Sequence, residues 1–285
     1  MFIPVILYFV IFCYVPMYGV IISFQDYYPR LGITGSEWVG FKHFEKLFTG
    51  RYFFPVLRNT LIISIGKLLF GFPAPIILCL LLNEVRSLKF KKVVQTISYL
   101  PHFISWVVLA SIVQTILSPS SGVVNYIIQL LGGEPIFFMG SSDWFRKVIV
   151  GSSIWRDTGW QTVVFMAAIL SIDPQLYEAA DLDGAGRFQK MIYVTLPCIA
   201  PTIIIMFIMA TGNVIQDDFD QIYNMLNAKV MDVGDVIGTY TYRMGIEKMN
   251  FSYATAVGLF KNVVSLILVT FTNAFSRKLS GSSLW

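Results

Sequence analysis

Six apolar stretches, each long enough to cross a lipid bilayer, alternate with polar loops along this chain. A membrane-spanning helix needs about 20 mostly apolar residues. We see no internal repeat or low-complexity tract, so we expect a single membrane domain over residues 1–285. The pattern predicts an all-α, polytopic membrane protein with transmembrane helices near residues 2–24, 55–82, 94–117, 147–170, 197–215 and 251–275.

The first apolar stretch has the length of a membrane span rather than of a secretion signal. It lacks a basic beginning and a small-residue cleavage site, so we interpret residues 2–24 as a membrane helix. The chain starts abruptly at this helix, and we expect a short cytoplasmic segment to precede it.

Loop charge indicates how the spans are oriented, because short loops rich in Lys and Arg stay in the cytoplasm. The longer loop 25–54 is also basic, so the short loop 83–93 carries more weight. We therefore expect both termini, loop 83–93 and the loop that contains Glu178 in the cytoplasm, and the loops near 25–54, 118–146 and 216–250 outside. The basic residues behind this orientation are Arg86, Lys89, Lys91 and Lys92 in the short loop, and Arg277 and Lys278 in the C-terminal tail.

The composition agrees with a membrane protein and argues against several other classes. Of 285 residues, 55% are hydrophobic and only 13% are charged, against about 25% charged in soluble domains. The net charge of +4 is small and scattered, so we expect the lipid bilayer and no nucleic acid as a partner. The three cysteines lie in or beside apolar runs and the two histidines lie far apart, so no disulfide framework or metal site is expected.

The polar segment between the fourth and fifth spans has the clearest local pattern. Asp173 can cap a helix and Pro174 suits its first position, so a helix is predicted to begin there. Gly184 should end it, because glycine adopts turn conformations that other residues resist. A second short helix over about 187–195 then leads into the fifth span. From these residues alone, an ordinary solvated loop would also fit.

The same segment matches a motif in residue type and spacing. The motif is Glu-Ala-Ala, three residues, Gly, nine residues, Ile, one residue and Leu-Pro, with Val194 here in place of Ile. The chain therefore resembles the permease subunits of binding-protein-dependent ABC importers, whose EAA loop contacts the ATPase. The resemblance implies a cytoplasmic helix-turn-helix coupling loop over about 171–196. Its coupling residues would be Glu178, Ala179, Ala180, Asp181, Asp183, Gly184, Leu196 and Pro197.

Three further stretches resemble the branch of this family that imports oligosaccharides released from polysaccharides, similar to maltose- and alginate-type permeases. The resemblance implies a type I importer fold and three kinds of protein partner: a second homologous permease, an ABC ATPase dimer and an extracytoplasmic solute-binding protein. The chain would be a transport subunit and not an enzyme, with ATP and Mg on the ATPase and no cofactor of its own. The stretches are Gly71-Phe72-Pro73-Ala74-Pro75, Leu81-Leu82-Asn83-Glu84 and Tyr99-Leu100-Pro101-His102-Phe103-Ile104-Ser105-Trp106.

Polar residues inside the predicted spans fall at a similar depth. With a rise of about 1.5 Å per residue, residues from four spans come out roughly 18–24 Å above the inner helix ends. Ionisable groups there are costly and mark either a pathway or a pairing. Ion pairing or hydrogen bonding within the bundle is the alternative for each residue. We predict a substrate path that includes Lys67, Ser105, Trp155, Arg156, Asp157, Gln161, Asn213, Gln216, Asp217 and Lys261.

Two local patterns refine the second span. Thr60, Ser64, Lys67 and Gly71 recur at helical spacing and are expected to share one face. The proline-rich stretch 71–75 is expected to interrupt this helix, because proline removes a backbone donor.

The bases Lys67, Arg156 and Lys261 slightly favour an acidic oligosaccharide over a neutral one, because uronate carboxylates would offset their burial. The alternative is that protein carboxylates already neutralise them. Other classes stay open at this point. They are an ABC permease for another solute, a stand-alone secondary transporter or channel, and a membrane enzyme using the acidic cluster Asp217, Asp218 and Asp220.

Overall fold

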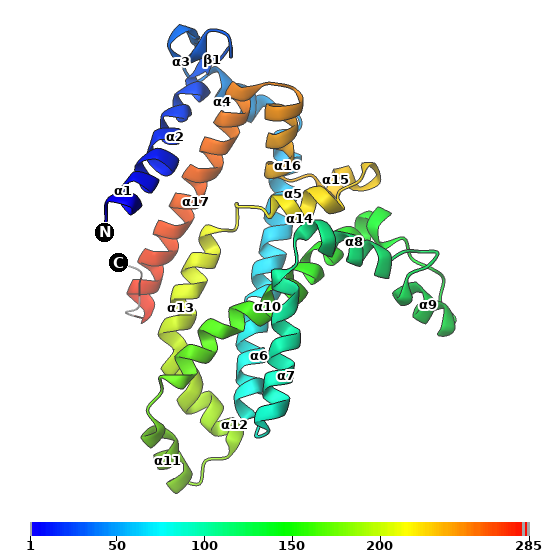
Figure 1. Cartoon of the computed structure of the whole chain (residues 1–285), viewed down its shortest axis with the longest axis vertical. Helices are drawn as coiled ribbons and strands as arrows, with labels where there is room; N and C mark the ends of the chain where they lie inside the picture. Colours follow the sequence, from blue (N-terminus) through cyan, green and yellow to red (C-terminus); the bar gives the residue numbers. More distant parts are fainter. Residues whose placement is uncertain (1, 281–282, 284–285) are drawn as a thin grey trace.

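The computed structural model describes residues 2–280 and 283 of this chain. It is an elongated and largely helical molecule, and among its long helices α10 (Ser142–Leu170) crosses the centre obliquely (Figure 1). Within the described residues, four helices are long and apolar enough to cross a membrane. The number is six when each of two bent helix pairs is counted as one span.

The first two spans are separated in space by the C-terminal helix α17 (Phe251–Ser280) and are joined by a segment that carries a two-stranded sheet (Figure 1). The first span, Ile3–Phe24, contacts the rest of the protein mainly through its last turns, which lie against the C-terminal helix. The elements are α1 (Ile3–Phe9), η1 (Val10–Tyr14), α2 (Val15–Met17), η2 (Tyr18–Phe24), β1 (Gln25–Asp26), α3 (Gly32–Gly35), β2 (Glu37–Trp38), α4 (Lys42–Thr49), α5 (Phe53–Gly66), η3 (Lys67–Gly71) and α6 (Pro73–Glu84). Strands β1 and β2 pair antiparallel, with Gln25 opposite Trp38.

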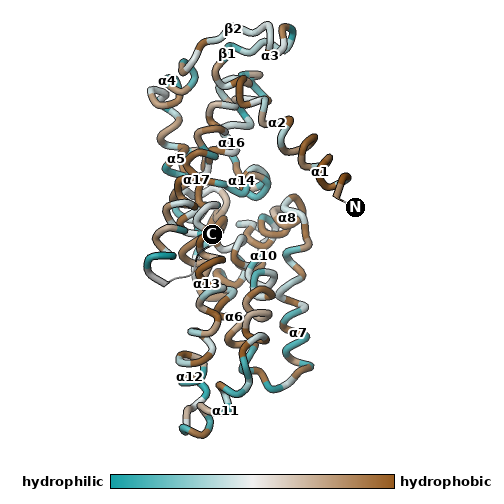
Figure 2. Tube along the Cα trace, turned by 90° about the vertical axis from the view of Figure 1, so that its left-hand side faces the viewer, coloured by the Kyte–Doolittle hydropathy of each residue, from teal (hydrophilic) through white to brown (hydrophobic). Residues whose placement is uncertain are grey.

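The remaining elements include the helices that cross the centre of the molecule. They are α7 (Leu88–Tyr99), η4 (Leu100–Phe103), α8 (Trp106–Ile116), α9 (Val123–Leu130), η5 (Phe138–Gly140), α10 (Ser142–Leu170), α11 (Pro174–Leu182), α12 (Arg187–Lys190), η6 (Met191–Thr195), α13 (Leu196–Gly212), α14 (Phe219–Met225), η7 (Ala228–Val230), α15 (Met231–Gly234), α16 (Ile237–Tyr242), η8 (Arg243–Glu247) and α17 (Phe251–Ser280). Figure 2 shows polar residues at the α11–α12 end and many apolar residues along the long helices.

The expected interruption of the second span is smaller than the sequence indicated. Helix Phe53–Glu84 is continuous, and only the turn Lys67–Gly71 widens to π-helical geometry. Pro73 takes one of the first positions of α6, and the wider turn accommodates its missing N–H group. The prediction of a break at residues 71–75 is therefore wrong, because one π turn absorbs the irregularity.

The third span is bent within the stretch 94–117, where the sequence predicted one transmembrane helix. Helix α7 and the 3-10 turn η4 end at Phe103, and α8 leaves at an angle of 109°. Ile104 and Ser105 have extended backbones, and the Ser105 hydroxyl accepts a hydrogen bond from Val108 N at 3.5 Å. The expectation of one helix over 94–117 is wrong because Ser105 starts a new helix as its N-cap.

Helix α10 is the centre of the packing and contacts α6, α7 and α13. It lies close to α7 at Gly159, where an added Cβ would lie 2.0 Å from the carbonyl oxygen of Ser98. The two backbones thus touch at this point, as small residues allow between membrane helices. By contrast, an added Cβ at Gly151 on the same helix would meet no atom within 4 Å.

We expect Gly159→Ala to destabilise the protein, because the methyl group must push α7 away from α10. The expected loss is about 1–3 kcal/mol, measured as a lower thermal unfolding midpoint of the detergent-solubilised protein. Gly151→Ala is the control and should be neutral or slightly stabilising, because alanine favours helix. Equal effects of the two substitutions would contradict the close contact.

Candidate functional site

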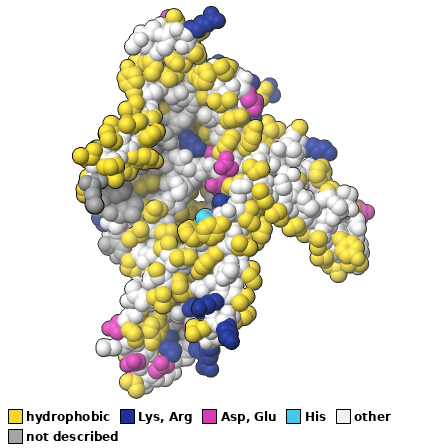
Figure 3. Space-filling model, viewed as in Figure 1, with side chains coloured by type: hydrophobic (Ala, Val, Ile, Leu, Met, Phe, Trp, Pro, Cys, Tyr) yellow, Lys and Arg dark blue, Asp and Glu magenta, His cyan; other side chains and the backbone are white. Residues whose placement is uncertain are grey.

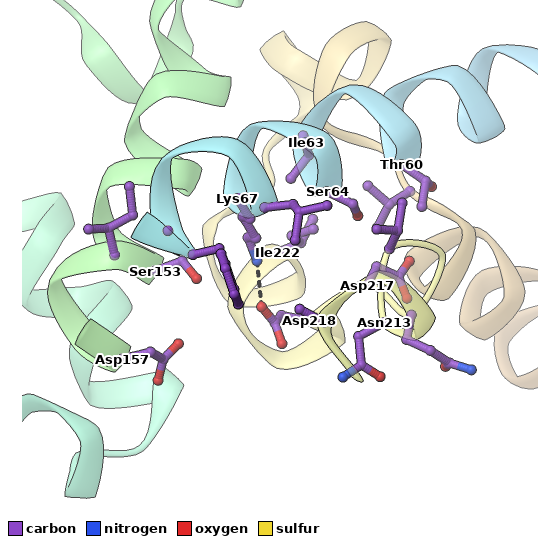
Figure 4. A pocket seen from close by; sticks show the side chains of 18 of the residues that line it. Thr60, Ile63, Ser64, Lys67, Ser153, Asp157, Asn213, Asp217, Asp218 and Ile222 are labelled. Atoms are coloured by element: carbon purple, nitrogen blue, oxygen red, sulfur yellow. Dashed lines mark hydrogen bonds and ion pairs between the residues drawn. The ribbon is translucent and has the colours of Figure 1, made fainter. Parts of the chain in front are cut away.

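A polar cavity of about 240 Å³ opens between α5, α10 and the segment that follows α13. Figure 3 shows a hollow in the middle of one face, where acidic, basic and histidine side chains gather among apolar ones. Figure 4 shows the side chains that enter the cavity from these elements. The polar residues that line it are Thr60, Ser64, Lys67, Ser153, Asp157, Thr158, Gln161, Asn213, Gln216, Asp217 and Asp218.

One face of the second span forms a wall of this cavity. Thr60, Ser64, Lys67 and Gly71 all line it, which confirms that they share a face. Thr60 also accepts a hydrogen bond from Ile237 N at 2.9 Å and so joins α5 to α16. The π turn begins at Lys67, and such local widening is frequent at functional sites.

Lys67 reaches across the cavity to the segment around α14. Its Nζ donates to Asp218 Oδ2 and to Gln221 Oε1, both at 2.5 Å. Gln221 is buried, and its Nε2 donates to the carbonyl of Ile149 and to the hydroxyl of Ser152 on α10. Lys67 is therefore held by an amide that is itself fixed in the core.

A second ion pair lies beside the first. Lys261 on α17 donates to Asp217 Oδ1 at 2.7 Å, and Gly238 N donates to the other carboxylate oxygen. An added Cβ at Gly238 would lie 2.7 Å from Asp217 Oδ1, so only glycine lets the carboxylate come this close. Asp217 thus joins the end of α13 to both α16 and α17.

A third charged cluster lies on α10. Asp157 Oδ1 lies 3.3 Å from Arg156 Nη1 and 3.1 Å from His102 Nδ1. The Arg156 guanidinium lies over the Trp106 ring at 4.8 Å, and His102 stacks on Trp160 with a centroid distance of 5.0 Å. The bend after α7 therefore brings His102 and Trp106 against α10. Sequence analysis placed His102 in the stretch 99–106 that resembles oligosaccharide permeases but did not predict its contact with Asp157.

The structure brings together part of the predicted substrate path. Ser105 caps α8, and Trp155 lies on the surface with 47% of its area exposed. Arg156 and Lys261 are ion-pair partners of cavity residues and do not line the cavity themselves. The residues of the predicted path that do line it are Lys67, Asp157, Gln161, Asn213, Gln216 and Asp217.

Each of the three bases that favoured an acidic substrate has a carboxylate partner on this chain. Lys67 pairs with Asp218, Lys261 with Asp217, and Arg156 with Asp157. This is the alternative that the sequence left open. The three basic side chains in the spans are therefore not, by themselves, an argument for an acidic substrate.

An aromatic cluster next to the cavity was missed in the sequence. The Phe219 and Tyr223 rings on α14 stack at 5.1 Å, and Tyr242 on α16 lies 5.3 and 5.2 Å from them. A hydrogen bond with Tyr242 raises the pKa of Tyr223. Flat aromatic faces of this kind suit the C–H faces of sugars. The spacing of Phe219 and Tyr223 on one helical face was the available signal, but the segment was interpreted as a loop.

The acidic residues 217, 218 and 220 do not converge on one point. Asp217 and Asp218 pair with different lysines, and Asp220 is exposed on α14. Among residues 2–280 and 283, the structure holds no group of three or more His, Cys, Asp or Glu side chains placed to bind a metal ion. Asp217 and Asp218 thus form two separate ion pairs, and the three carboxylates do not form one site.

The loop between α10 and α13 is a helix-turn-helix, as the sequence predicted. Asp173 Oδ1 accepts a hydrogen bond from Gln175 N at 3.0 Å and caps α11. Gly184 has a φ of +76°, which a side chain with a Cβ resists. The second helix does not stop before Leu196-Pro197, since Arg187–Gly212 is one continuous helix with a π turn at Met191–Thr195. The π turn directly before Leu196-Pro197 accommodates the missing N–H group of the proline.

Two contacts hold the halves of this loop together. Lys190 Nζ lies 2.7 Å from Asp181 Oδ1, and the Tyr177 hydroxyl lies 2.9 Å from the Thr195 hydroxyl. Large apolar side chains nevertheless face solvent, and Leu182 is 90% exposed. Leu176, Phe188 and Tyr193 in the same loop are exposed as well, and a large exposed apolar surface is typical of a contact site for another protein.

Long apolar helices around a polar cavity, with a helix-turn-helix at one end, define a membrane transport subunit. The family described as "Binding-protein-dependent transport system inner membrane component" matches residues 71–281, and the chain belongs to this family. It is a multi-pass membrane permease with the type I ABC importer fold, which confirms the predicted fold class.

Relatives and solved structures match nearly the whole chain. It is 46% identical over 285 residues to the polygalacturonan/rhamnogalacturonan transport system permease protein YteP of Bacillus subtilis, covering 100% of this chain and 89% of that protein. It is 48% identical over 283 residues to protein LplB of the same organism, covering 99% and 89%. The crystal structure of a bacterial alginate ABC transporter with alginate pentasaccharide-bound periplasmic protein matches with a TM-score of 0.92 and 42% identity, over 100% of this chain and 95% of that chain.

We expect Gly238→Ala to weaken the end of α13, because the new methyl group displaces the Asp217 carboxylate from Gly238 N and Lys261. A loss of about 1–3 kcal/mol should appear as a lower unfolding midpoint. Gly258→Ala on α17 is the control, because an added Cβ there meets no atom within 4 Å. An unchanged midpoint for Gly238→Ala would argue against the carboxylate contact.

Proposed function

We propose that this chain is one of two permease subunits of an ATP-driven importer for uronate-containing oligosaccharides derived from polysaccharides. The observation that carries the proposal is 46% identity over the full chain to a permease named for polygalacturonan and rhamnogalacturonan. The similarity to a transporter of the acidic polysaccharide alginate, with a TM-score of 0.90, points the same way. These polysaccharides share uronic acid units, so the substrate class is an acidic oligosaccharide.

The chemistry of the cavity supports a sugar substrate. Asn213 and Gln161 bring amides to it, and Asp157 and Asp218 bring carboxylates, all of which can bond to sugar hydroxyls. The neighbouring rings of Phe219, Tyr223 and Tyr242 supply apolar faces. A neutral oligosaccharide is the second candidate, because all three bases near the cavity are already paired.

The proposed orientation places the α11–α12 loop and both termini in the cytoplasm of a bacterial cell. A groove at this end is lined by Arg86 and Glu84 together with Tyr177, Arg187 and Lys190. The basic loop between α6 and α7 therefore lies beside the helix-turn-helix. Since basic loops stay inside, loop charge and the resemblance to the EAA loop agree on one orientation. The β1–β2 end would then face a solute-binding protein.

The proposed assembly has a second homologous permease, an ABC ATPase dimer and an extracytoplasmic solute-binding protein. The exposed surface of α11 and α12, with Glu178, Leu182 and Phe188, would contact the ATPase. ATP and Mg would bind to the ATPase subunits, since this sequence has no Gly-x-x-x-x-Gly-Lys-Ser/Thr loop. Residues 171–196 would couple ATP hydrolysis to movement of α10 and α13.

Gly184→Val should uncouple ATP hydrolysis from uptake, because valine resists the positive φ and reshapes the loop tip. We expect uptake by the assembled transporter in proteoliposomes to fall by about tenfold or more, equivalent to about 1.4 kcal/mol, while ATP hydrolysis continues. Gly132→Val is a matched control, because Gly132 also has a positive φ and open space but lies after α9. Glu178→Lys should act like Gly184→Val. Wild-type uptake in both loop variants would contradict the coupling role.

The assembly can be tested by purification. The chain expressed together with a partner ABC ATPase and a second homologous permease should co-purify with both, whereas the chain alone should bind no nucleotide. Detection of micromolar ATP binding by the isolated chain would contradict the proposal that ATP binds only to the ATPase subunits.

The substrate class can be tested with the complete transporter. Binding protein loaded with a uronic-acid oligosaccharide should stimulate ATP hydrolysis more strongly than binding protein loaded with a neutral oligosaccharide of equal length. Stimulation by the neutral sugar alone would favour the second candidate and leave the importer assignment unchanged.

A further inference from the structure

The two lysine ion pairs at the cavity differ in how far they are open to it. The Asp217 side chain is 1% exposed, and its partner Lys261 is 16% exposed. The Asp218 side chain is 49% exposed, whereas its partner Lys67 is only 17% exposed. The first pair is a closed contact between helices. The second joins a sheltered ammonium group to a carboxylate that faces the cavity.

The two carboxylates also differ in what holds them. Asp217 is fixed by Lys261 on one oxygen and by Gly238 N on the other. Asp218 is bound through its Oδ2 to Lys67, and although it stands at the N-cap of α14, its side chain caps no N–H group there. Asp218 can therefore turn towards the cavity with the loss of one contact, its bond to Lys67, while Lys67 stays joined to α14 through Gln221.

Lys67 would stay in place if Asp218 turned away. Its Nζ also donates to Gln221 Oε1, and Gln221 is fully buried and bonded to Ile149 and Ser152 on α10. This bond keeps the ammonium group aimed at the cavity. A carboxylate arriving in the cavity would find a positioned cation whose present partner is half exposed.

We propose that Lys67 binds a carboxylate of the passing oligosaccharide, and that Asp218 occupies this position when no substrate is present. The inference rests on the proposed function, because it requires a uronate-containing substrate. One carboxylate replaces another on the same ammonium group, and Asp218 becomes hydrated in the cavity. Exchange is easier here because Asp218 is half exposed and can be solvated once it leaves Lys67. It would not be easy at the buried Asp217, whose removal leaves a buried charge unpaired.

This arrangement would also let the substrate leave. A lysine without a competing carboxylate would hold a uronate group firmly, whereas passage requires binding that is favourable but readily reversed. Asp218 supplies that competition within the protein. The amides of Asn213 and Gln161 remain available for the hydroxyl groups of the same sugar.

The test compares single and double charge-removing variants in the complete transporter, at equal amounts of assembled complex in proteoliposomes. Uptake of a uronic-acid oligosaccharide should fall about tenfold or more in Lys67→Gln, and Lys67→Arg should keep most of it. The double variant Lys67→Gln with Asp218→Asn should stay as low as Lys67→Gln. Asp218→Asn alone should lower both the half-saturating concentration and the maximal rate.

The matched control is the second pair. Lys261→Gln should lose uptake because it leaves the buried Asp217 unpaired, and the added Asp217→Asn should restore much of it. If the Lys67 and Asp218 double variant recovers in the same way, that pair is only structural. The inference is then overturned, although wild-type uptake of the acidic sugar still supports the proposed function. If the wild type takes up only neutral sugar, the proposed function and this inference fall together.

Discussion

The arrangement at the centre of this protein depends on the cost of placing charges within membrane-spanning helices. A charge there needs a partner. Lys67 and Lys261 pair with carboxylates from distant segments, and Arg156 pairs with the next residue, Asp157. Lys261 ties α17 to the end of α13, and Lys67 ties α5 to α14. The segment 213–218 leaves the helical path between these contacts, and its unwound backbone is tolerated because it lines a cavity. Charge pairing therefore fixes where α13 ends and where the polar cavity begins.

The extent of the spans could be predicted from hydropathy, but their breaks could not. The sequence predicted a break at Pro73, but a π turn accommodates this proline. The bend at Ser105 does not interrupt the apolar stretch, so hydropathy gives no sign of it. In both cases the outcome depends on a few backbone groups and on neighbouring helices. The capping role of Ser105 was visible only as a serine before an apolar run. Hydropathy averages over many residues and cannot resolve such local choices.

The depth of the polar residues in the membrane could be predicted from the sequence, but their ion-pair partners could not. A rise of about 1.5 Å per residue was enough to bring residues of several spans to one level. It could not tell that Lys261 would face Asp217 or that Arg156 would lie on Trp106, because these contacts depend on the rotation of each helix. A single sequence gives no sign of the role of Gly238, because this glycine leaves room for the carboxylate of Asp217, which comes from another element. The helix-turn-helix was predicted better because caps and turns are encoded locally, by Asp173 and Gly184.

The continuity of Arg187–Gly212 gives the two polar regions a direct mechanical connection. This helix begins in the helix-turn-helix and ends at the cavity segment that holds Asn213 and Asp217. On the other side of the loop, α10 carries Asp157 at the cavity and meets α11 at an angle of 70°. The loop is thus attached to both helices that form opposite walls of the cavity. A break at Leu196-Pro197 would have isolated the loop from one wall. Because the helix instead continues through a π turn, one continuous helix joins the loop to the segment with Asn213 and Asp217, and α10 joins the same loop to Asp157.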